Sequence, residues 1–144
     1  MKYPDEIPPG SANKGDDYRR FVIETVNRLP DGQRYLPEPA DIKLVNGSHL
    51  SDFGIEVAKR RSVTESWYPS GIYAETGALY YIQGDYLVIA VFNKRALIDM
   101  HKAGQVDSYE MPTLQGFVLP RAEARRMSLN WIDVMDIDQI KLPL

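Results

Sequence analysis

The sequence predicts an α/β (α+β) fold, with a central mixed β-sheet flanked by helices. Amphipathic helical stretches alternate with short strand-like runs along the chain, an order typical of a sheet covered by helices. The longest apolar run, residues 86–92, has the length of a strand, whereas a membrane span needs about 20 residues. The chain has 144 residues, 44% of them hydrophobic, which is enough for the core of one domain.

The N-terminal region differs in composition from the rest of the chain. Its prolines and glycine lie among polar residues, so residues 1–15 are expected to form a flexible arm and residues 16–144 a single domain. The first residues lack the apolar core of a signal peptide. The chain has no cysteine, which excludes disulfides and thiolate zinc sites and makes a reducing cytoplasm the simplest location.

The first half of the chain is expected to contain one helix and two or three strands. Apolar residues form one stripe over residues 18–29, a pattern that predicts a helix. Residues 33–36 form a short strand candidate, and 41–45 and 52–59 are stronger ones. Asn46-Gly47 is a typical hairpin turn, so the strands 41–45 and 52–59 are expected to form an antiparallel pair.

The second half is expected to alternate strands and helices. Ser70 is expected to cap a short helix at 72–79, and Asn93 a helix at 94–102. The other expected elements are a hairpin of strands 80–82 and 86–91, a strand at 116–120, a helix at 121–127 and a final strand at 131–134.

The net charge of −3 argues against a protein that binds polyanions over its whole surface. Residues 18–126, however, carry 14 basic and 13 acidic side chains. The basic residues cluster in three places: Lys59-Arg60-Arg61, Lys94-Arg95, and Arg121 with Arg125-Arg126. The clusters indicate either a local phosphate-binding face or ordinary solvated charges.

Several common site types are absent from the sequence. It has no glycine-rich phosphate loop, no dinucleotide fingerprint and no Gly-x-Ser-x-Gly nucleophile motif. His49 and His101 lie far apart in the sequence and outside any metal-ligand pattern, so both are expected on the surface. The remaining candidates for chemistry are carboxylates near strand ends.

Asp41 and Glu56 are the candidate pair of carboxylates. Asp41 begins one expected strand, and Glu56 lies in the middle of the next, where alternation puts Glu56 and Ala58 on the face opposite the core. Two carboxylates on adjacent strands can hold Mg²⁺, which activates water and stabilises charge on a phosphate. Alternatively, Glu56 is a solvent-facing carboxylate paired with an arginine.

The spacing of Asp41 and the segment Gly54-Ile55-Glu56-Val57 resembles the metal-binding half of the PD-(D/E)XK motif of a nuclease superfamily. The segment Tyr68-Pro69-Ser70-Gly71-Ile72, followed by Leu79-Tyr80-Tyr81, is similar to a phage-associated branch of that superfamily. The resemblance covers roughly residues 17–120.

The resemblance implies a restriction-endonuclease-like fold and hydrolysis of DNA phosphodiester bonds with Mg²⁺ or Mn²⁺. It gives Asp41 and Glu56 the role of metal ligands and places Glu24 where many members have a further acidic residue. It also allows a homodimer, and it implies the cytoplasm of a bacterium or of a phage-infected host cell.

The chain departs from the motif at Ala58, where the family has a lysine. Lys59 is adjacent but would point to the other face of a regular strand unless a β-bulge re-aims it. Lys43 shares a face with Asp41 and is the alternative catalytic lysine. Asp52 is an alternative acid if the register of its strand differs. A protein that no longer cleaves, and binds nucleic acid or a protein partner, is the alternative function.

Further residues are candidates for contact with nucleic acid. They are basic, aromatic or hydroxyl side chains from residues 60–70 and from the Lys94-Arg95 cluster: Arg60, Arg61, Lys94, Arg95, Tyr68 and Ser70. Trp67, Tyr68 and Tyr73 have the chemistry to stack on bases but also to cover a core. A third hypothesis is a structural or regulatory protein that shares only the topology.

Overall fold

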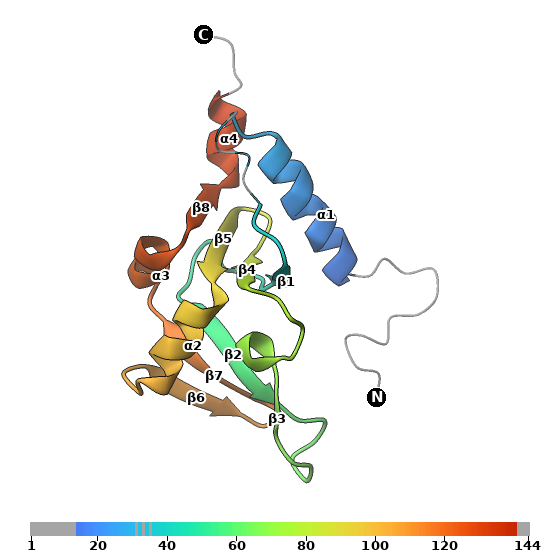
Figure 1. Ribbon diagram of the computed structural model, residues 1–144, viewed down its shortest axis with the longest axis vertical. Coiled ribbons are helices and arrows are strands. Elements are labelled where there is room, and N and C mark those ends of the chain that lie inside the picture. The colour runs from blue at the N-terminus through green and yellow to red at the C-terminus, as the bar shows by residue number, and fades with distance from the viewer. Residues whose placement is uncertain (1–13, 31, 33, 35, 141–144) are drawn as a thin grey trace.

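The computed structural model describes residues 14–30, 32, 34 and 36–140. This part of the chain has an α+β fold with two four-stranded sheets and four α-helices (Figure 1). The helices are α1 (Lys14–Asn27), α2 (Lys94–Lys102), α3 (Arg121–Met127) and α4 (Val134–Ile140), with a 3₁₀ helix η1 (Gly71–Tyr73). The strands are β1 (Ala40–Leu44), β2 (Phe53–Lys59), β3 (Tyr68–Pro69), β4 (Tyr80–Gly84), β5 (Val88–Asn93), β6 (Asp107–Met111), β7 (Leu114–Leu119) and β8 (Asn130–Asp133). The expectation of one central sheet is therefore wrong.

The first sheet has the strand order β1-β4-β5-β8 and is mixed. The hairpin of β4 and β5 is antiparallel, as predicted, and β1 adds to it in parallel. Asp41 pairs with Tyr81, and Lys43 with Gln83. Paired residues point to the same face of a sheet, so these four side chains share one face.

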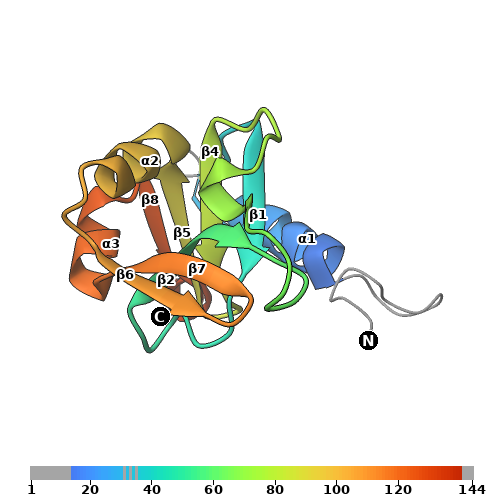
Figure 2. The ribbon, with the colours of Figure 1, turned by 90° about the horizontal axis from the view of Figure 1, so that it is seen from below.

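The second sheet is antiparallel, with the order β3-β2-β7-β6, and crosses one end of the first (Figure 2). The predicted pairing of β1 with β2 is wrong, because the two strands belong to different sheets. Contacts from distant residues hold the segment between them: Asp85 accepts from the backbone N–H of His49, and Arg121 donates to the carbonyl of Ser48. These bonds lead the chain away from a tight hairpin.

Two hydrophobic clusters fill the two sides of the first sheet. Helix α1 lies along one face (Figure 1), where Tyr18 and Val22 pack with Ile82 and Ile89. The second sheet, α2 and α3 supply the cluster on the other side, which contains Phe53, Ile55, Phe92, Leu97, Phe117 and Ala124. Asp41 and Lys43 therefore lie on the side of the second sheet, away from α1.

The other predicted elements have mixed outcomes. Helices α2 and α3 are confirmed, and Asn93 caps α2 by accepting from the N–H of Ala96 at 3.2 Å. The helix predicted at 72–79 is reduced to η1, and Ser70 makes no side-chain cap there. Strands β3 and β6 and helix α4 were not predicted.

The N-terminal predictions fall partly outside the described residues. Lys14 and Gly15, expected in the arm, belong to α1, and residues 1–13 lie outside the description. Of the strand expected at 33–36, residues 33 and 35 are also outside it, and Leu36 is not in a strand. None of the helices in the described chain has the length and apolar character to cross a membrane.

Candidate functional site

Asp41 lies near the start of β1 and is held by two side chains from elsewhere in the fold. Its Oδ2 accepts from Lys94 Nζ at 2.9 Å and from Thr76 Oγ1 at 2.8 Å. Lys94 begins α2, and Thr76 lies in the segment between η1 and β4. The carboxylate therefore marks the point where β1, α2 and this segment meet.

Glu56 lies on β2, yet its carboxylate contacts the ammonium of Lys43 on β1. This ion pair bridges the two sheets and brings Glu56 to the face that carries Asp41. The Glu56 side chain is only 12% exposed. Burial alone would raise its pKa, but Lys43, the nearby Ser70 hydroxyl and Lys59 together hold the pKa of Glu56 below its usual value.

A β-bulge in β2 decides where Lys59 points. Glu56 pairs with Gly116, Ala58 with Gln115 and Lys59 with Leu114, so Val57 is the extra residue of the bulge. Gly116 and Leu114 are two residues apart on β7 and face the same side. Lys59 therefore shares the side of Glu56, and Ala58 takes the other side. In a regular strand Ala58 would share the side of Glu56, and Lys59 would face the other side.

Lys94 is a buried lysine, which contradicts its prediction as a residue that contacts nucleic acid. Its side chain is 8% exposed. Besides Asp41, its ammonium donates to the carbonyl of Ala74 at 3.2 Å and to Thr76 Oγ1 at 3.4 Å. Buried charges persist only when paired and hydrogen-bonded, so Lys94 and Asp41 stabilise each other inside the fold.

The turn Pro69-Ser70-Gly71 closes over the backbone of Glu56. Gly71 has a φ of +58°, and a Cβ at this position would lie 2.1 Å from the carbonyl oxygen of Glu56. Ser70 is 3% exposed. Its Oγ makes no hydrogen bond of ordinary geometry with the described residues, although it lies near enough to the Glu56 carboxylate to lower the pKa of that group. A buried hydroxyl without a well-formed hydrogen bond is rare in folded proteins.

Tyrosines also approach the two carboxylates. The buried Tyr81 hydroxyl donates to Gln83 Oε1 at 3.0 Å. Its pKa is raised by burial and by the negative charges of Glu56 and Asp41. Tyr109 on β6 has its pKa raised by burial and by Glu56. Both phenols therefore remain protonated beside the acids.

Bare backbone at Gly116 makes room for the Tyr109 ring. A Cβ on Gly116 would lie 2.5 Å from the Tyr109 hydroxyl, and one on Gly54 would lie 3.0 Å from it. The Tyr109 ring therefore packs against the backbone of both glycines, on the side of the second sheet that carries Glu56.

Two predicted acids lie outside this group. Glu24 is exposed on α1, which covers the opposite face of the first sheet from Asp41. Asp52 accepts from the backbone N–H of Arg121 at 2.8 Å and so caps the start of α3. A carboxylate at a helix N-terminus is stabilising in its own right, so Asp52 has a structural role.

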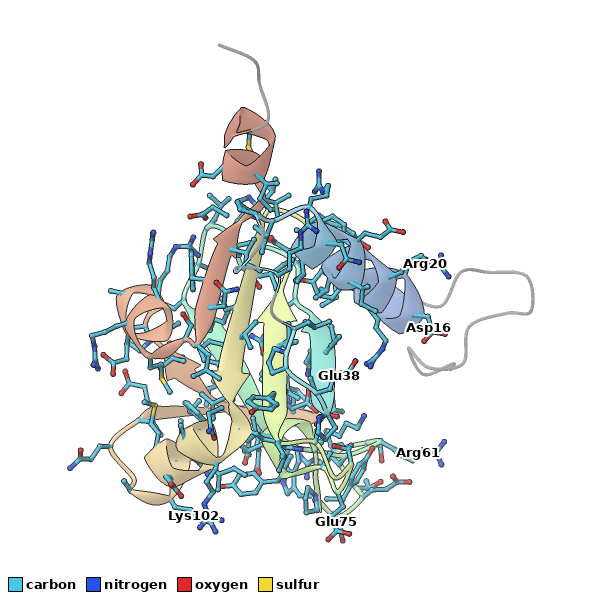
Figure 3. The ribbon with its side chains drawn as sticks, turned by 45° about the horizontal axis from the view of Figure 1, so that its top comes forward. Asp16, Arg20, Glu38, Arg61, Glu75 and Lys102 are labelled. Carbon is cyan, nitrogen blue, oxygen red and sulfur yellow. The ribbon has the colours of Figure 1, made fainter. Side chains whose placement is uncertain are left out.

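The candidates for nucleic-acid contact surround the turn and the loop before it. Arg60 stacks its guanidinium over Trp67 at 4.2 Å, and Lys59 lies 5.9 Å from the ring centre of Tyr68. Arg61 is exposed and projects outward (Figure 3). Arg95 is exposed and pairs with Asp99 at 3.0 Å. Arg60 and Arg61 thus lie near the site, on the loop that follows Lys59.

The two histidines are half-buried rather than on the surface. His49 Nδ1 contacts Asp85 Oδ2 at 2.5 Å, and His101 Nδ1 shares a hydrogen bond with the Tyr73 hydroxyl at 2.6 Å. Hydrogen bonds from the His49 side chain and three backbone N–H groups hold the pKa of Asp85 below its usual value, although burial opposes this. His49 and Asp85 anchor the turn that connects β4 and β5 to the segment after β1.

The residues around Glu56 fit a hard divalent cation in their chemistry. Asp41 and Glu56 offer carboxylate oxygens, and each of these carboxylates already contacts a lysine ammonium, Lys94 and Lys43 respectively. In the part of the chain that is described, no three His, Cys, Asp or Glu side chains form a cluster. Mg²⁺ commonly takes one or two carboxylates and completes its shell with water and substrate phosphate, so two carboxylates match its usual protein ligands.

Comparisons with protein-family models, with curated proteins and with solved structures found no match to this chain.

Sequence reasoning did not find Thr76, Tyr81 and Tyr109 as members of this site. Tyr81 reads as an ordinary core aromatic of a hairpin strand, and Tyr109 lies on a strand that was not predicted. Thr76 lies in a region expected to be helical. Their roles depend on contacts between segments that are distant in sequence, so no local pattern reports them.

Proposed function

We propose that the protein is a divalent-metal-dependent nuclease that hydrolyses phosphodiester bonds in DNA, with a restriction-endonuclease-like site. The observation that carries the proposal is the bulge at Val57, which puts Lys59 on the side of Glu56. The site then has an acid and a lysine in the relation that the resembled motif requires, despite Ala58.

Each residue has a role that follows from its position. Asp41 and Glu56 would hold Mg²⁺ or Mn²⁺, which when bound supplies an activated water and stabilises charge on the phosphate. Lys59 is exposed at the end of β2, where its ammonium would stabilise the charge that develops on the phosphate oxygens. Lys43 and Lys94 hold the two carboxylates in position.

The reaction is a hydrolysis that needs only water as co-reactant. A water oxygen forms a bond to phosphorus, and the bond from phosphorus to one sugar oxygen breaks. The water loses a proton to solvent, and the departing sugar oxygen takes one up. The basic loop with Arg60 and Arg61 would hold the neighbouring phosphates.

The test is plasmid nicking with Mg²⁺ or Mn²⁺, comparing the wild type with Glu56→Gln and Asp41→Asn. Both variants remove a charge and keep the size of the side chain. We expect each to lower the cleavage rate at least a hundredfold, in line with the loss of a transition-state charge stabiliser. Glu65→Gln is the matched control, because Glu65 is an exposed acid in the loop between β2 and β3.

Thermal unfolding of every variant separates loss of chemistry from loss of fold. Absence of metal-dependent cleavage in the folded wild type contradicts the proposal. Equal cleavage by the wild type and Glu56→Gln contradicts the assigned role of Glu56.

One observation favours a second candidate, a nuclease-like protein that binds nucleic acid or a protein without cleaving. Both carboxylates already have lysine partners, Lys43 for Glu56 and Lys94 for Asp41. A cation would have to compete with these ammonium groups. Under this alternative, calorimetric titration with Mn²⁺ shows no binding that depends on Glu56.

A further inference from the structure

A shallow hollow of about 360 Å³ lies at the β3 edge of the second sheet. The side chains that line it include aromatic rings, a proline, an imidazole and an amide: Trp67, Tyr68, Pro69, Tyr73, His101 and Gln115. Pockets for small molecules range over roughly 300–1,000 Å³. The hollow is at the small end of this range, and its aromatic lining suits a flat ring system that stacks on it.

Contacts with neighbouring residues hold part of the lining of the hollow in place. The imidazole of His101 shares its hydrogen bond with Tyr73 and stacks on Phe117, with ring centres 5.5 Å apart and an interplanar angle of 15°. The amide of Gln115 donates to Glu110 at 2.7 Å. Tyr73, His101 and Gln115 therefore form the fixed part of the hollow.

The charge beside the hollow is positive. Residues 59–68 carry three basic side chains and one acidic one, Glu65. Arg60 stacks on Trp67, and Lys59 lies over Tyr68. The same two rings line the hollow, so the apolar surface and the basic loop are continuous.

The hollow is also adjacent to the proposed catalytic site. Tyr68 pairs with Lys59 across β3 and β2, and Pro69 pairs with Ala58. Lys59 belongs to the side of β2 that carries Glu56, and Ala58 lines the hollow. A nucleotide chain that passes over the short edge strand β3 would contact both.

A larger hollow elsewhere lacks these features. It has a volume of about 850 Å³ and lies between the end of α2 and α3, where Met100, Val106 and Glu123 are among its lining residues. Among the described residues, no aromatic or basic side chain lines it, so it offers neither stacking surfaces nor cations to a nucleic acid.

We propose that the hollow binds one unpaired nucleobase, and that the preferred substrate is nucleic acid with an unpaired nucleotide next to the cleaved phosphodiester. This inference rests on the proposed nuclease function and names its substrate class. Trp67 and Tyr68 would stack on the base, while Lys59 and Arg60 hold the adjoining phosphates. Stacking on an aromatic side chain tolerates every base, so the preference is for an unpaired nucleotide and not for a sequence.

Tryptophan fluorescence provides the test, because the chain has only two tryptophans, Trp67 and Trp131. The difference in fluorescence emission between the wild type and a Trp67→Phe variant is the emission of Trp67. Two DNAs are titrated in EDTA, a 20-base-pair duplex and the same duplex with one unpaired nucleotide at its centre. We expect the unpaired nucleotide to quench Trp67 and to tighten binding about tenfold, the scale of one base–aromatic stack.

A Trp67→Ala variant is expected to bind the two DNAs with equal affinity. Trp131→Phe is the matched control and is expected to keep the wild-type preference and the wild-type affinity for the plain duplex. Equal affinity of the wild type for the two DNAs, absence of binding to either, or no quenching of Trp67 overturns the inference.

The inference and the nuclease proposal fail in different ways. A Glu56→Gln protein is expected to cleave at least a hundredfold more slowly than the wild type and still show the quenching. Preference for the unpaired nucleotide without any cleavage by the wild type would support binding of an unpaired base in the hollow and overturn the hydrolysis. Cleavage of fully paired DNA without quenching of Trp67 would support the hydrolysis and overturn the binding of an unpaired base in the hollow.

Discussion

Glu56 is constrained through its side chain and through its backbone. The carboxylate contacts Lys43, while the carbonyl oxygen lies directly against the turn at Gly71. The position of the carboxylate therefore depends on a glycine that has no chemistry of its own. The Pro-Ser-Gly-Ile segment, which the sequence offered only as a resemblance, thus has a physical explanation in this fold.

A Gly71→Ala substitution tests this dependence. A left-handed backbone costs a non-glycine residue about 1–2 kcal/mol, and the Cβ would meet the Glu56 carbonyl at 2.1 Å. We expect the free energy of unfolding, measured by urea denaturation, to fall by at least about 2 kcal/mol. Gly77→Ala is the matched control, because Gly77 also has a positive φ but no atom within 4 Å of an added Cβ. Equal losses in the two variants would contradict a tight turn over Glu56.

At the scale of the element, the bulge in β2 brings Lys59 to the side of Glu56, although Ala58 stands where the resembled motif has its lysine. Deleting Ala58 is expected to let Val57 pair with Gln115, which removes the bulge and leaves Lys59 on the side of Glu56, since the strand would then alternate as Glu56, Val57, Lys59. The deletion variant should therefore keep most of its metal-dependent cleavage. Lys59→Met, in either background, should lower the cleavage rate by on the order of a hundredfold. The comparison uses initial rates of plasmid nicking.

Two results would contradict this account of the bulge. One is a folded deletion variant without cleavage, and the other is a Lys59→Met variant that cleaves like the wild type. Lys43→Met distinguishes the two lysines further, because Lys43 already contacts Glu56 and its loss is expected to disturb metal binding more than the chemical step.

The turn after β4 is an element whose stability depends on pH. Asp85 accepts from the N–H groups of Leu87 and Val88 at 2.8 and 2.9 Å, and from both the backbone and the ring of His49. The pKa of Asp85 is lowered in the folded state. Its contribution to stability is therefore present above the ordinary aspartate pKa of about 3.9 and is lost as the pH falls through the lower, folded-state pKa.

An Asp85→Asn variant measures this contribution. Hydrogen bonds to a charged group stabilise by roughly 1.5–3 kcal/mol, and the amide oxygen of the variant would retain part of them. We expect the wild type to be more stable by about 1–2 kcal/mol near pH 7, with the difference shrinking below about pH 4. Urea unfolding at pH 7, 5 and 3 provides the comparison. A difference that is the same at all three values would contradict the role of the charge.

Local patterns predicted the elements that are made by neighbouring residues. The hairpin of β4 and β5, the Asn93 cap of α2 and helix α3 follow from strand alternation, a cap and a helical stripe in contiguous residues. The Asn46-Gly47 signal failed because contacts from Asp85 and Arg121 fix the segment after β1. The bulge at Val57 has no signal in β2 itself, since it is defined by the register against β7.

The candidate site shows the same division. The sequence singled out Asp41, Lys43, Glu56 and Lys59. In the structure Lys43 shares a face of the first sheet with Asp41 and contacts Glu56, and Lys59 lies on the side of β2 that carries Glu56. Sequence reasoning did not foresee that Lys94 would be buried against Asp41, because a lysine at the start of a helix usually faces solvent. A pairing of this kind depends on how α2 packs against β1, which is a property of the whole fold.

At the scale of the molecule, the charge is unevenly distributed. The net charge is −3, so any binding to DNA depends on local clusters of basic residues. Arg60 and Arg61 lie on the loop beside the site, and Arg61 projects outward from it (Figure 3). Arg125 and Arg126 lie on α3, which is distant from that loop in the fold (Figure 1). The two pairs allow a test of which face meets the nucleic acid.

The Arg60→Ala, Arg61→Ala double variant is expected to bind DNA more weakly and with less dependence on salt. Each neutralised phosphate contributes about −0.9 to the slope of log K against log salt concentration, so loss of two contacts should reduce the slope by roughly 1.8. The measurement is fluorescence anisotropy of a labelled duplex in EDTA at several salt concentrations. Arg125→Ala, Arg126→Ala removes the same charge from α3 and is expected to leave the slope nearly unchanged. Because the two variants have the same net charge, an equal fall in both would mean that DNA responds to total charge and not to the loop. A fall only in the α3 variant would place the nucleic acid on the other side of the molecule, away from Glu56.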